Sequence, residues 1–90
     1  MELSYKVGFS GQGLKQLERL TPTDRKRVIS KVLLLANFDR MGNVKKLQGR
    51  LAEFWRLRIG KIRVIFEVDR RLKRVKIVDV GYRSRIYQGR

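Results

Sequence analysis

The hydrophobic pattern of residues 55–66 predicts a β-hairpin. Two runs of alternating apolar and polar residues meet at Gly60-Lys61, a pair that favours a two-residue turn. Such a turn fixes four cross-strand pairs, which are Ile59–Ile62, Arg58–Arg63, Leu57–Val64 and Arg56–Ile65. Because side chains alternate between the two faces of a strand, one face of this hairpin should be apolar and should enter the core. That face comprises Trp55, Leu57, Ile59, Ile62, Val64 and Phe66.

The opposite face of the predicted hairpin gathers three arginines, Arg56, Arg58 and Arg63. Like charges that oppose each other directly weaken a sheet. A small surface that nevertheless holds three guanidinium groups is typical of a site for an external anion. The plainer alternative is a solvated strand face.

The N-terminal third predicts a strand and two helices. Residues 3–10 alternate as a strand does, and Ser10 can cap a helix over residues 11–20, with leucines at helical spacing at Leu14, Leu17 and Leu20. Thr21, Pro22 and Asp24 are typical of a second helix start. That helix should reach about Phe38 and carry a broad apolar stripe of Val28, Ile29, Val32, Leu33, Leu35 and Ala36. The two helices should form a hairpin over one face of a sheet.

The remaining segments complete an α+β fold. Residues 37–43 read as a loop, residues 44–50 as a short basic connector, and residues 69–73 as a second hairpin turn. Residues 75–80 are almost continuously apolar, which is typical of an interior strand. The order β-α-α-β-β-β predicts α+β architecture, with the last three strands as an antiparallel meander. The pattern does not place the first strand within the sheet.

Charge changes this picture more than composition does. The chain of 90 residues has 23 Lys and Arg against 8 Asp and Glu, a net charge of +15. Residues 1–44 contribute +4 and residues 45–90 contribute +11. This asymmetry favours an anionic partner, most often nucleic acid, over a basic surface kept for solubility.

Two missing residue types restrict the chemistry. Without cysteine there is neither a disulfide nor a thiolate metal site, and without histidine the usual metal ligand and the usual general base are lacking. We therefore expect no metal and no cofactor. The apolar runs are too short for a membrane span, and we expect no membrane partner and a cytoplasmic location.

Five short segments are similar to signatures of one protein superfamily. They are Lys46-Leu47-Gln48-Gly49, Trp55-Arg56-Leu57-Arg58-Ile59-Gly60, Arg63-Val64-Ile65-Phe66-Glu67-Val68, Val80-Gly81-Tyr82-Arg83 and Ile86-Tyr87. On these segments the chain resembles the RelE/ParE superfamily of toxins from type II toxin–antitoxin systems. The resemblance covers nearly the whole length and implies a single RelE-like toxin domain over residues 1–90, with a helical hairpin on one face of a small, mostly antiparallel sheet.

The resemblance also implies an activity. The superfamily includes toxins that cut mRNA in the ribosomal A site and toxins that poison DNA gyrase, and the chain looks more like the first, RelE-like group. It implies a metal-independent endoribonuclease in which the 2′-hydroxyl attacks the adjacent phosphate. The implied catalytic residues are Arg56, Arg58, Arg63, Arg83 and Tyr87, with Arg85 as the alternative to Arg83.

One departure from the RelE-like pattern affects the chemistry. The second-strand pair is commonly lysine in that group, and here both positions are arginine. Arginine keeps its proton at working pH, so Arg56 is a poor candidate for proton transfer and Tyr87 is the better one. Tyr87 could instead be a packing residue. The residues expected to contact RNA or the ribosome are Lys45, Lys46, Arg50, Lys61 and Arg85.

Two further side chains allow a structural reading. Trp55 shares its face with Leu57 and Ile59 and should belong to the core. Glu67 falls on the arginine face, where it could orient an arginine or form an ordinary cross-strand salt bridge.

The resemblance implies three partners, which are a cognate acidic RelB-like antitoxin, the ribosome and mRNA. The antitoxin should mask the arginines. Two other functions stay open. One is a ParE-like inhibitor of DNA gyrase, which the absence of an evident extra C-terminal helix disfavours. The other is an inactive toxin-fold binding module.

Overall fold

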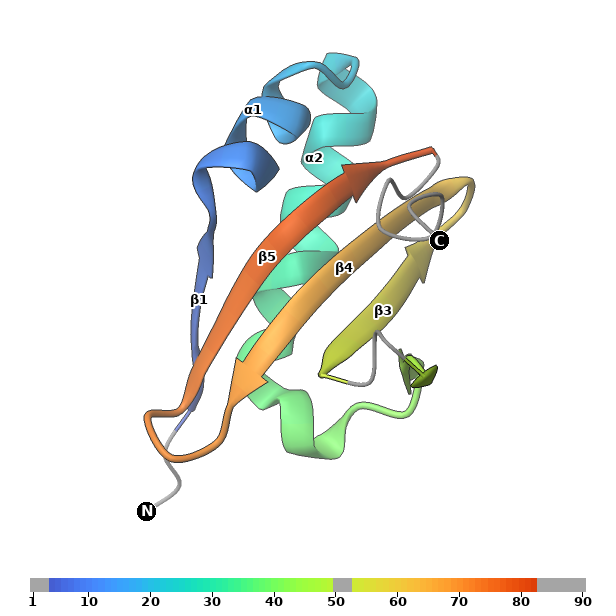
Figure 1. Ribbon diagram of the computed structural model, residues 1–90. Helices are drawn as coiled ribbons and strands as arrows, with labels where there is room; N and C mark the ends of the chain where they lie inside the picture. The colour runs from blue at the N-terminus through green and yellow to red at the C-terminus, as the bar shows by residue number, and fades with distance from the viewer. Residues whose placement is uncertain (1–3, 50–52, 83–90) are drawn as a thin grey trace.

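A computed structural model describes residues 4–49 and 53–82, and Figure 1 gives the arrangement of their elements. The elements in chain order are β1 (Lys6–Phe9), α1 (Gly11–Glu18), α2 (Pro22–Leu33), the 3-10 helix η1 (Leu34–Arg40), β2 (Val44–Lys46), β3 (Phe54–Ile59), β4 (Ile62–Asp69) and β5 (Arg74–Gly81). Two helices on a mixed five-stranded sheet confirm the predicted α+β class.

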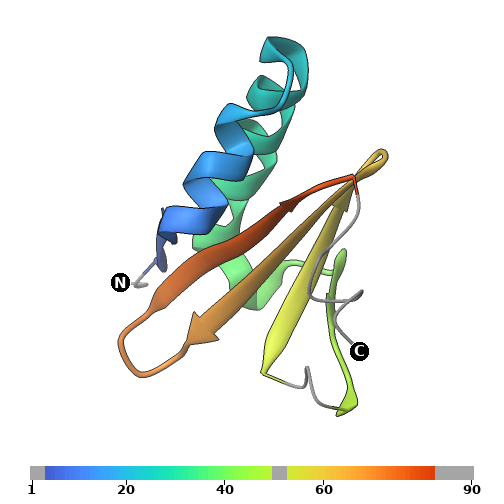
Figure 2. The ribbon, with the colours of Figure 1, turned by 45° about the horizontal axis from the view of Figure 1, so that its top comes forward.

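The sheet has the strand order β1-β5-β4-β3-β2. The strands β2 to β5 pair antiparallel, whereas β1 pairs parallel with β5. The predicted meander is therefore confirmed, and β5 is the interior strand that its apolar run predicted. Figure 2 shows α1 and α2 on one side of the twisted sheet. We call the side that carries the helices the inner face and the opposite side the outer face.

Both α-helices begin at the predicted caps. The Ser10 hydroxyl accepts a hydrogen bond from the Gly13 amide at 3.0 Å, and the Thr21 hydroxyl accepts one from the Asp24 amide at 3.2 Å. Pro22 occupies the first turn of α2, where its missing N–H costs nothing. The helical hairpin is thus specified by local side-chain chemistry.

The second helix is shorter as an α-helix than predicted, because α2 ends at Leu33 and the chain continues as the 3-10 helix η1. The segment η1 is kinked at Asn37, whose φ of −107° and ψ of 39° are not helical. Leu35 and Phe38, on the two sides of this kink, are both buried. The ring of Phe38 contacts those of Tyr5, Trp55 and Phe66 edge-on, with centroid distances of 4.9–6.0 Å. The tighter helix therefore joins the helical layer to the aromatic part of the core.

The predicted apolar stripes are wider than the buried ones. Of the predicted positions, Leu14 is 47% exposed, Ile29 39% and Leu33 61%. A helix lying on a single sheet buries only the residues that point at it. In α2 these are Val28 and Val32.

The central hairpin forms with the predicted register. All four predicted pairs are present, including Arg58 opposite Arg63. Gly60 has a φ of +60°, which suits the first central position of a type II′ turn. The second turn follows Asp69, whose carboxylate accepts hydrogen bonds from the Arg71 and Leu72 amides. Register and turn chemistry therefore agree with the sequence pattern.

One predicted connector is a strand. Residues 44–46 pair with β3 as β2, with Val44 opposite Leu57 and Lys45 opposite Arg56. Val44 packs against the core. A three-residue segment with one apolar side chain lacks the alternation by which strands are recognised, so its pairing depends on the neighbouring strand.

The edge of β5 extends past the end of β1, and α1 completes it. The Gln16 side chain accepts a hydrogen bond from the Val80 amide at 2.8 Å and donates one to the Asp79 carboxylate at 2.7 Å. Gln12 donates to the Val78 carbonyl at 3.4 Å. These bonds partly replace those of a neighbouring strand and satisfy groups that would otherwise be costly to bury.

Candidate functional site

The outer face of β2, β3 and β4 carries four cations in two directly opposed pairs. Lys45 lies opposite Arg56, and Arg58 lies opposite Arg63. Opposed residues in antiparallel strands have Cβ atoms about 5 Å apart. The structure thus places together the three arginines predicted from the hairpin register and adds Lys45 to them. We call these four residues the arginine patch.

The side chains of the arginine patch differ in exposure. Arg58 and Lys45 are exposed, whereas Arg56 and Arg63 are half-buried and make further contacts. Within residues 4–49 and 53–82, neither Arg58 nor Lys45 forms an ion pair. Exposed guanidinium groups present a fork of donors that matches two oxygens of one phosphate. The patch is therefore suited to bind a phosphodiester.

The other basic residues predicted to contact RNA do not all share this face. Lys61 lies in the β3–β4 turn, exposed at the end of the hairpin. Lys46 pairs with Trp55, and its ammonium lies 5.9 Å from the indole ring. Because Trp55 belongs to the inner face, Lys46 is separated from the arginine patch by the alternation of β2. A contact of Lys46 with RNA or the ribosome stays a prediction, and it would have to be made away from the arginine patch.

Four predicted site residues, Arg50, Arg83, Arg85 and Tyr87, lie outside the described residues. Their roles stay predictions.

Trp55 and Glu67 have structural roles. The Trp55 ring packs edge-on against Phe38 at 4.9 Å, as expected of a core residue. Glu67 forms a cross-strand ion pair with Lys76 at 3.7 Å. Of the two readings of Glu67, the structure supports the ordinary salt bridge over the orientation of an arginine.

A cluster that the sequence pattern does not reveal connects α2 to the end of the sheet that carries the β3–β4 turn. The Tyr82 hydroxyl donates a hydrogen bond to the Asp24 carboxylate, and the Arg27 guanidinium lies 3.8 Å from the same carboxylate. The hydrogen bond to Asp24 raises the pKa of Tyr82, and desolvation adds to the rise. Asp24 and Tyr82 are 58 positions apart, so no local pattern signals their contact.

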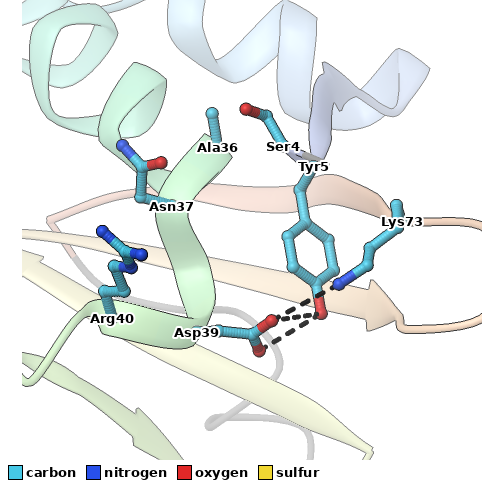
Figure 3. A pocket seen from close by; sticks show the side chains of 7 residues that line it. All are labelled: Ser4, Tyr5, Ala36, Asn37, Asp39, Arg40 and Lys73. Atoms are coloured by element: carbon cyan, nitrogen blue, oxygen red, sulfur yellow. Dashed lines mark hydrogen bonds and ion pairs between the residues drawn. The ribbon is translucent and has the colours of Figure 1, made fainter. Parts of the chain in front are cut away.

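A pocket of about 240 Å³ lies at the other end of the sheet, beside η1 (Figure 3). Its centre is Asp39, which accepts a hydrogen bond from the Tyr5 hydroxyl at 3.3 Å and pairs with Lys73 at 3.5 Å. Arg70 reaches the same carboxylate at 3.1 Å. The carboxylate therefore links η1 to the start of β1 and to the β4–β5 turn, which is a structural role.

The described residues contain neither a cluster suited to a metal ion nor a membrane-spanning helix. No set of three or more carboxylate, imidazole or thiol groups there is arranged to hold a metal ion. In the same part of the chain, no helix has the length and apolar character to cross a membrane.

Comparison with protein families identifies the class of protein. The model of the ParE toxin of the type II toxin–antitoxin system parDE matches residues 7–87. The chain therefore belongs to the ParE toxin family and is a toxin of a type II toxin–antitoxin system. A comparison with curated proteins found no match.

Solved structures with the same fold come from toxin–antitoxin systems of bacteria and archaea. The RelBE2 toxin–antitoxin complex of Mycobacterium tuberculosis matches with a TM-score of 0.82 and 24% identity, covering 90% of this chain and 100% of that one. The RelE–RelB complex of Pyrococcus horikoshii matches with a TM-score of 0.71 and 26% identity, over 88% and 94%. The isolated RelE toxin of Escherichia coli matches with a TM-score of 0.74 and 22% identity, over 96% and 94%. The fold is thus that of RelE toxins.

Proposed function

We propose that this toxin is a ribosome-dependent mRNA endonuclease that inhibits translation by cutting mRNA in the A site. The observation that carries the proposal is the direct opposition of Arg58 and Arg63, with the Lys45–Arg56 pair beside it. A sheet tolerates such repulsion where an external anion relieves it. The phosphodiester of a bound message is an anion of this kind.

The proposed reaction needs charge stabilisation above all. The 2′-hydroxyl attacks the adjacent phosphorus and loses its proton, and the bond to the 5′ oxygen breaks as that oxygen gains a proton. The products are a 2′,3′-cyclic phosphate and a 5′-hydroxyl end. The phosphorane between them carries extra negative charge, and fixed arginines stabilise such charge without rearranging. Arg58, Arg63 and Arg56 have this role in the proposal.

Proton transfer falls to other groups, because an arginine stays protonated at working pH. In our proposal Tyr87 accepts the proton of the 2′-hydroxyl, and Arg83, or Arg85 in its place, adds charge at the phosphate. A nearby group of cations lowers the pKa of a phenol and makes it a better base. Because the toxin supplies mostly charge, the RNA conformation required for attack has to come from the ribosome. Lys45 and Lys61, together with Arg50, would hold the surrounding RNA.

A cognate antitoxin is the natural regulator of such a surface. Several of the similar structures are complexes of a RelE toxin with a RelB antitoxin, including those from M. tuberculosis and P. horikoshii. We propose an acidic RelB-like partner whose carboxylates neutralise the arginine patch. Bound antitoxin would then exclude RNA from the patch by occupying the same guanidinium groups.

Inhibition of DNA gyrase is the second candidate function, and the match to the ParE toxin model favours it. Under this alternative the arginine patch would contact gyrase or its DNA. The two functions require different targets and are separable in vitro.

The experiment is a toeprint on ribosomes stalled with a defined codon in the A site, run beside a gyrase supercoiling assay. The toxin should cut only the ribosome-bound message, and Arg58→Gln should reduce cutting at least tenfold, because a charge-assisted contact to phosphate is worth about 1.5–3 kcal/mol. Lys26→Gln, an exposed cation on α2, is the matched control and should cut normally. Inhibition of supercoiling without any cut would overturn the proposal in favour of the gyrase alternative.

A further inference from the structure

A second group of cations lies on the outer face, at the edge formed by β1 and β5. Lys6 is the register partner of Arg74, and Gly8 is the partner of Lys76. Val7 and Phe9 pack toward the core, so Lys6 and Gly8 point to the outer face. We call Lys6, Arg74 and Lys76 the edge patch.

The edge patch repeats the unfavourable charge arrangement of the arginine patch. Neighbouring strands lie about 4.8 Å apart, so the side chains of Lys6 and Arg74 start from adjacent backbone positions. Both are exposed, and neither pairs with a carboxylate in the part of the chain that the structure describes. Lys76 pairs with Glu67 at 3.7 Å, with both side chains largely exposed. One acid for three cations leaves the patch net positive.

The surface between these cations is hollowed. A shallow groove of about 270 Å³ is lined by Lys6, Gly8, Arg74 and Lys76 together with Val7, Phe9 and Val75. A Cβ at Gly8 would have no heavy atom within 4 Å other than those of Gly8 itself and its two neighbours in the chain. The missing side chain therefore leaves the floor of the groove open between the cations. A groove that is lined by cations and has no side chain at its base is suited to bind the phosphates of a nucleic-acid backbone.

The two patches lie on one face at opposite ends of the strands. Arg63 pairs with Gly81 at one end of β5, and Arg74 stands at the other end. Gly81 and Arg74 are seven steps apart along β5, which corresponds to roughly 23 Å at the rise of a strand. Between the patches lie Glu67, which is paired with Lys76, and the register pair Ile65–Asp79, in which both residues are buried and offer no contact to the strand.

We propose that the edge patch is a second binding site for RNA phosphates, so that one single strand of RNA contacts the arginine patch and the edge patch together. The inference rests on the proposed function in that its ligand is RNA. The arginine patch holds the phosphate that is cut, and the edge patch holds the same strand several nucleotides away. Tight binding then requires a strand long enough to span both patches.

The test measures binding of the free toxin to 2′-O-methyl RNA, which cannot be cut by 2′-hydroxyl attack. Single strands of about 3 and about 12 nucleotides are compared by fluorescence anisotropy over a range of salt concentrations. The test variant is Lys6→Gln/Arg74→Gln. The matched control is Lys26→Gln/Lys31→Gln, which removes the same charge from α2 on the inner side.

The edge patch predicts a length-dependent loss. The test variant should bind the 12-mer about tenfold more weakly than the control, and its salt slope should be smaller by about 1.4, because each phosphate contact to a single strand contributes about 0.7. Its affinity for the 3-mer should equal that of the control. Arg58→Gln should weaken both lengths.

Three results would overturn the inference. If the test variant and the control bound the 12-mer equally, the edge patch would not be an RNA-binding site, and the proposed function would be unaffected. An equal loss for both lengths would show that the edge patch does not act through strand length. If wild-type toxin bound neither length, the edge patch would not be an RNA site of the free toxin, whereas the proposed function would still be decided by the toeprint on ribosomes.

Discussion

The opposed pair Arg58–Arg63 should make the toxin less stable than its neutralised variant, and Arg58→Gln tests this directly. Two unit charges about 6 Å apart in water repel by roughly 0.7 kcal/mol, and about 0.1 M salt reduces this by nearly half. Arg58 is exposed and forms no ion pair among the described residues, so its removal costs little. We expect Arg58→Gln to raise the free energy of unfolding by about 0.5 kcal/mol at low salt, or about 2–4 °C in Tm.

The measurement is urea unfolding followed by circular dichroism, because urea adds no ions that screen charge. Lys26→Gln is the control and should leave stability unchanged within error. In about 1 M salt the Debye length falls to roughly 3 Å, and the gain from Arg58→Gln should disappear. Because Arg58→Gln should also reduce mRNA cutting, we expect the opposed pair to lower the stability of the toxin while supporting its activity. A variant that is less stable than wild type at low salt, with no response to salt, would refute this reasoning.

Three further predictions concern the scaffold. Gly13→Ala should destabilise the protein by about 1–3 kcal/mol in a thermal melt, because the new Cβ would stand 2.6 Å from the Ile77 carbonyl oxygen of β5. The control is Gly11→Ala, whose Cβ would meet no neighbouring side chain or strand within 4 Å, and it should be neutral or slightly stabilising. Gln16→Ala should cost about 2–4 kcal/mol in urea unfolding, because it removes the hydrogen bonds that Gln16 makes to the buried Asp79 carboxylate and to the Val80 amide. The hydrogen bond to Asp24 raises the pKa of Tyr82, so the folded protein holds the phenol proton more tightly than the unfolded chain does. The stability from this bond should be complete below about pH 10 and lost as pH rises through the folded-state pKa; Tyr82→Phe should abolish that part of the pH dependence, and an unchanged profile would contradict the assignment.

The sequence predicts best those features that depend on neighbouring residues. The central hairpin follows from strict alternation and a two-residue turn, and both helix starts follow from a capping hydroxyl at Ser10 and Thr21. The three arginines of the arginine patch share a face because the hairpin register places Arg58 opposite Arg63, whereas Lys45 joins them only through β2. Each of these features lies within a short stretch of chain, where the turn residues or a capping hydroxyl allow the backbone only a few conformations.

Features that depend on distant segments were not predictable. The β2 strand has one apolar residue and pairs only because β3 offers an edge, and this pairing sends Lys46 to the inner face. The parallel pairing of β1 with β5, which brings Lys6 beside Arg74, joins positions nearly 70 residues apart and depends on the packing of the whole sheet. The contact of Asp24 with Tyr82 is equally non-local. A pattern of residues cannot report such contacts without the fold.

The most direct test of the central claim is to map the 5′ ends of messages after brief expression of the toxin in growing cells. A ribosome-dependent endonuclease should produce new 5′-hydroxyl ends within translated codons, and these ends should be absent when translation initiation is blocked and strongly reduced for Arg58→Gln. Growth arrest with intact messages and altered DNA supercoiling would contradict it.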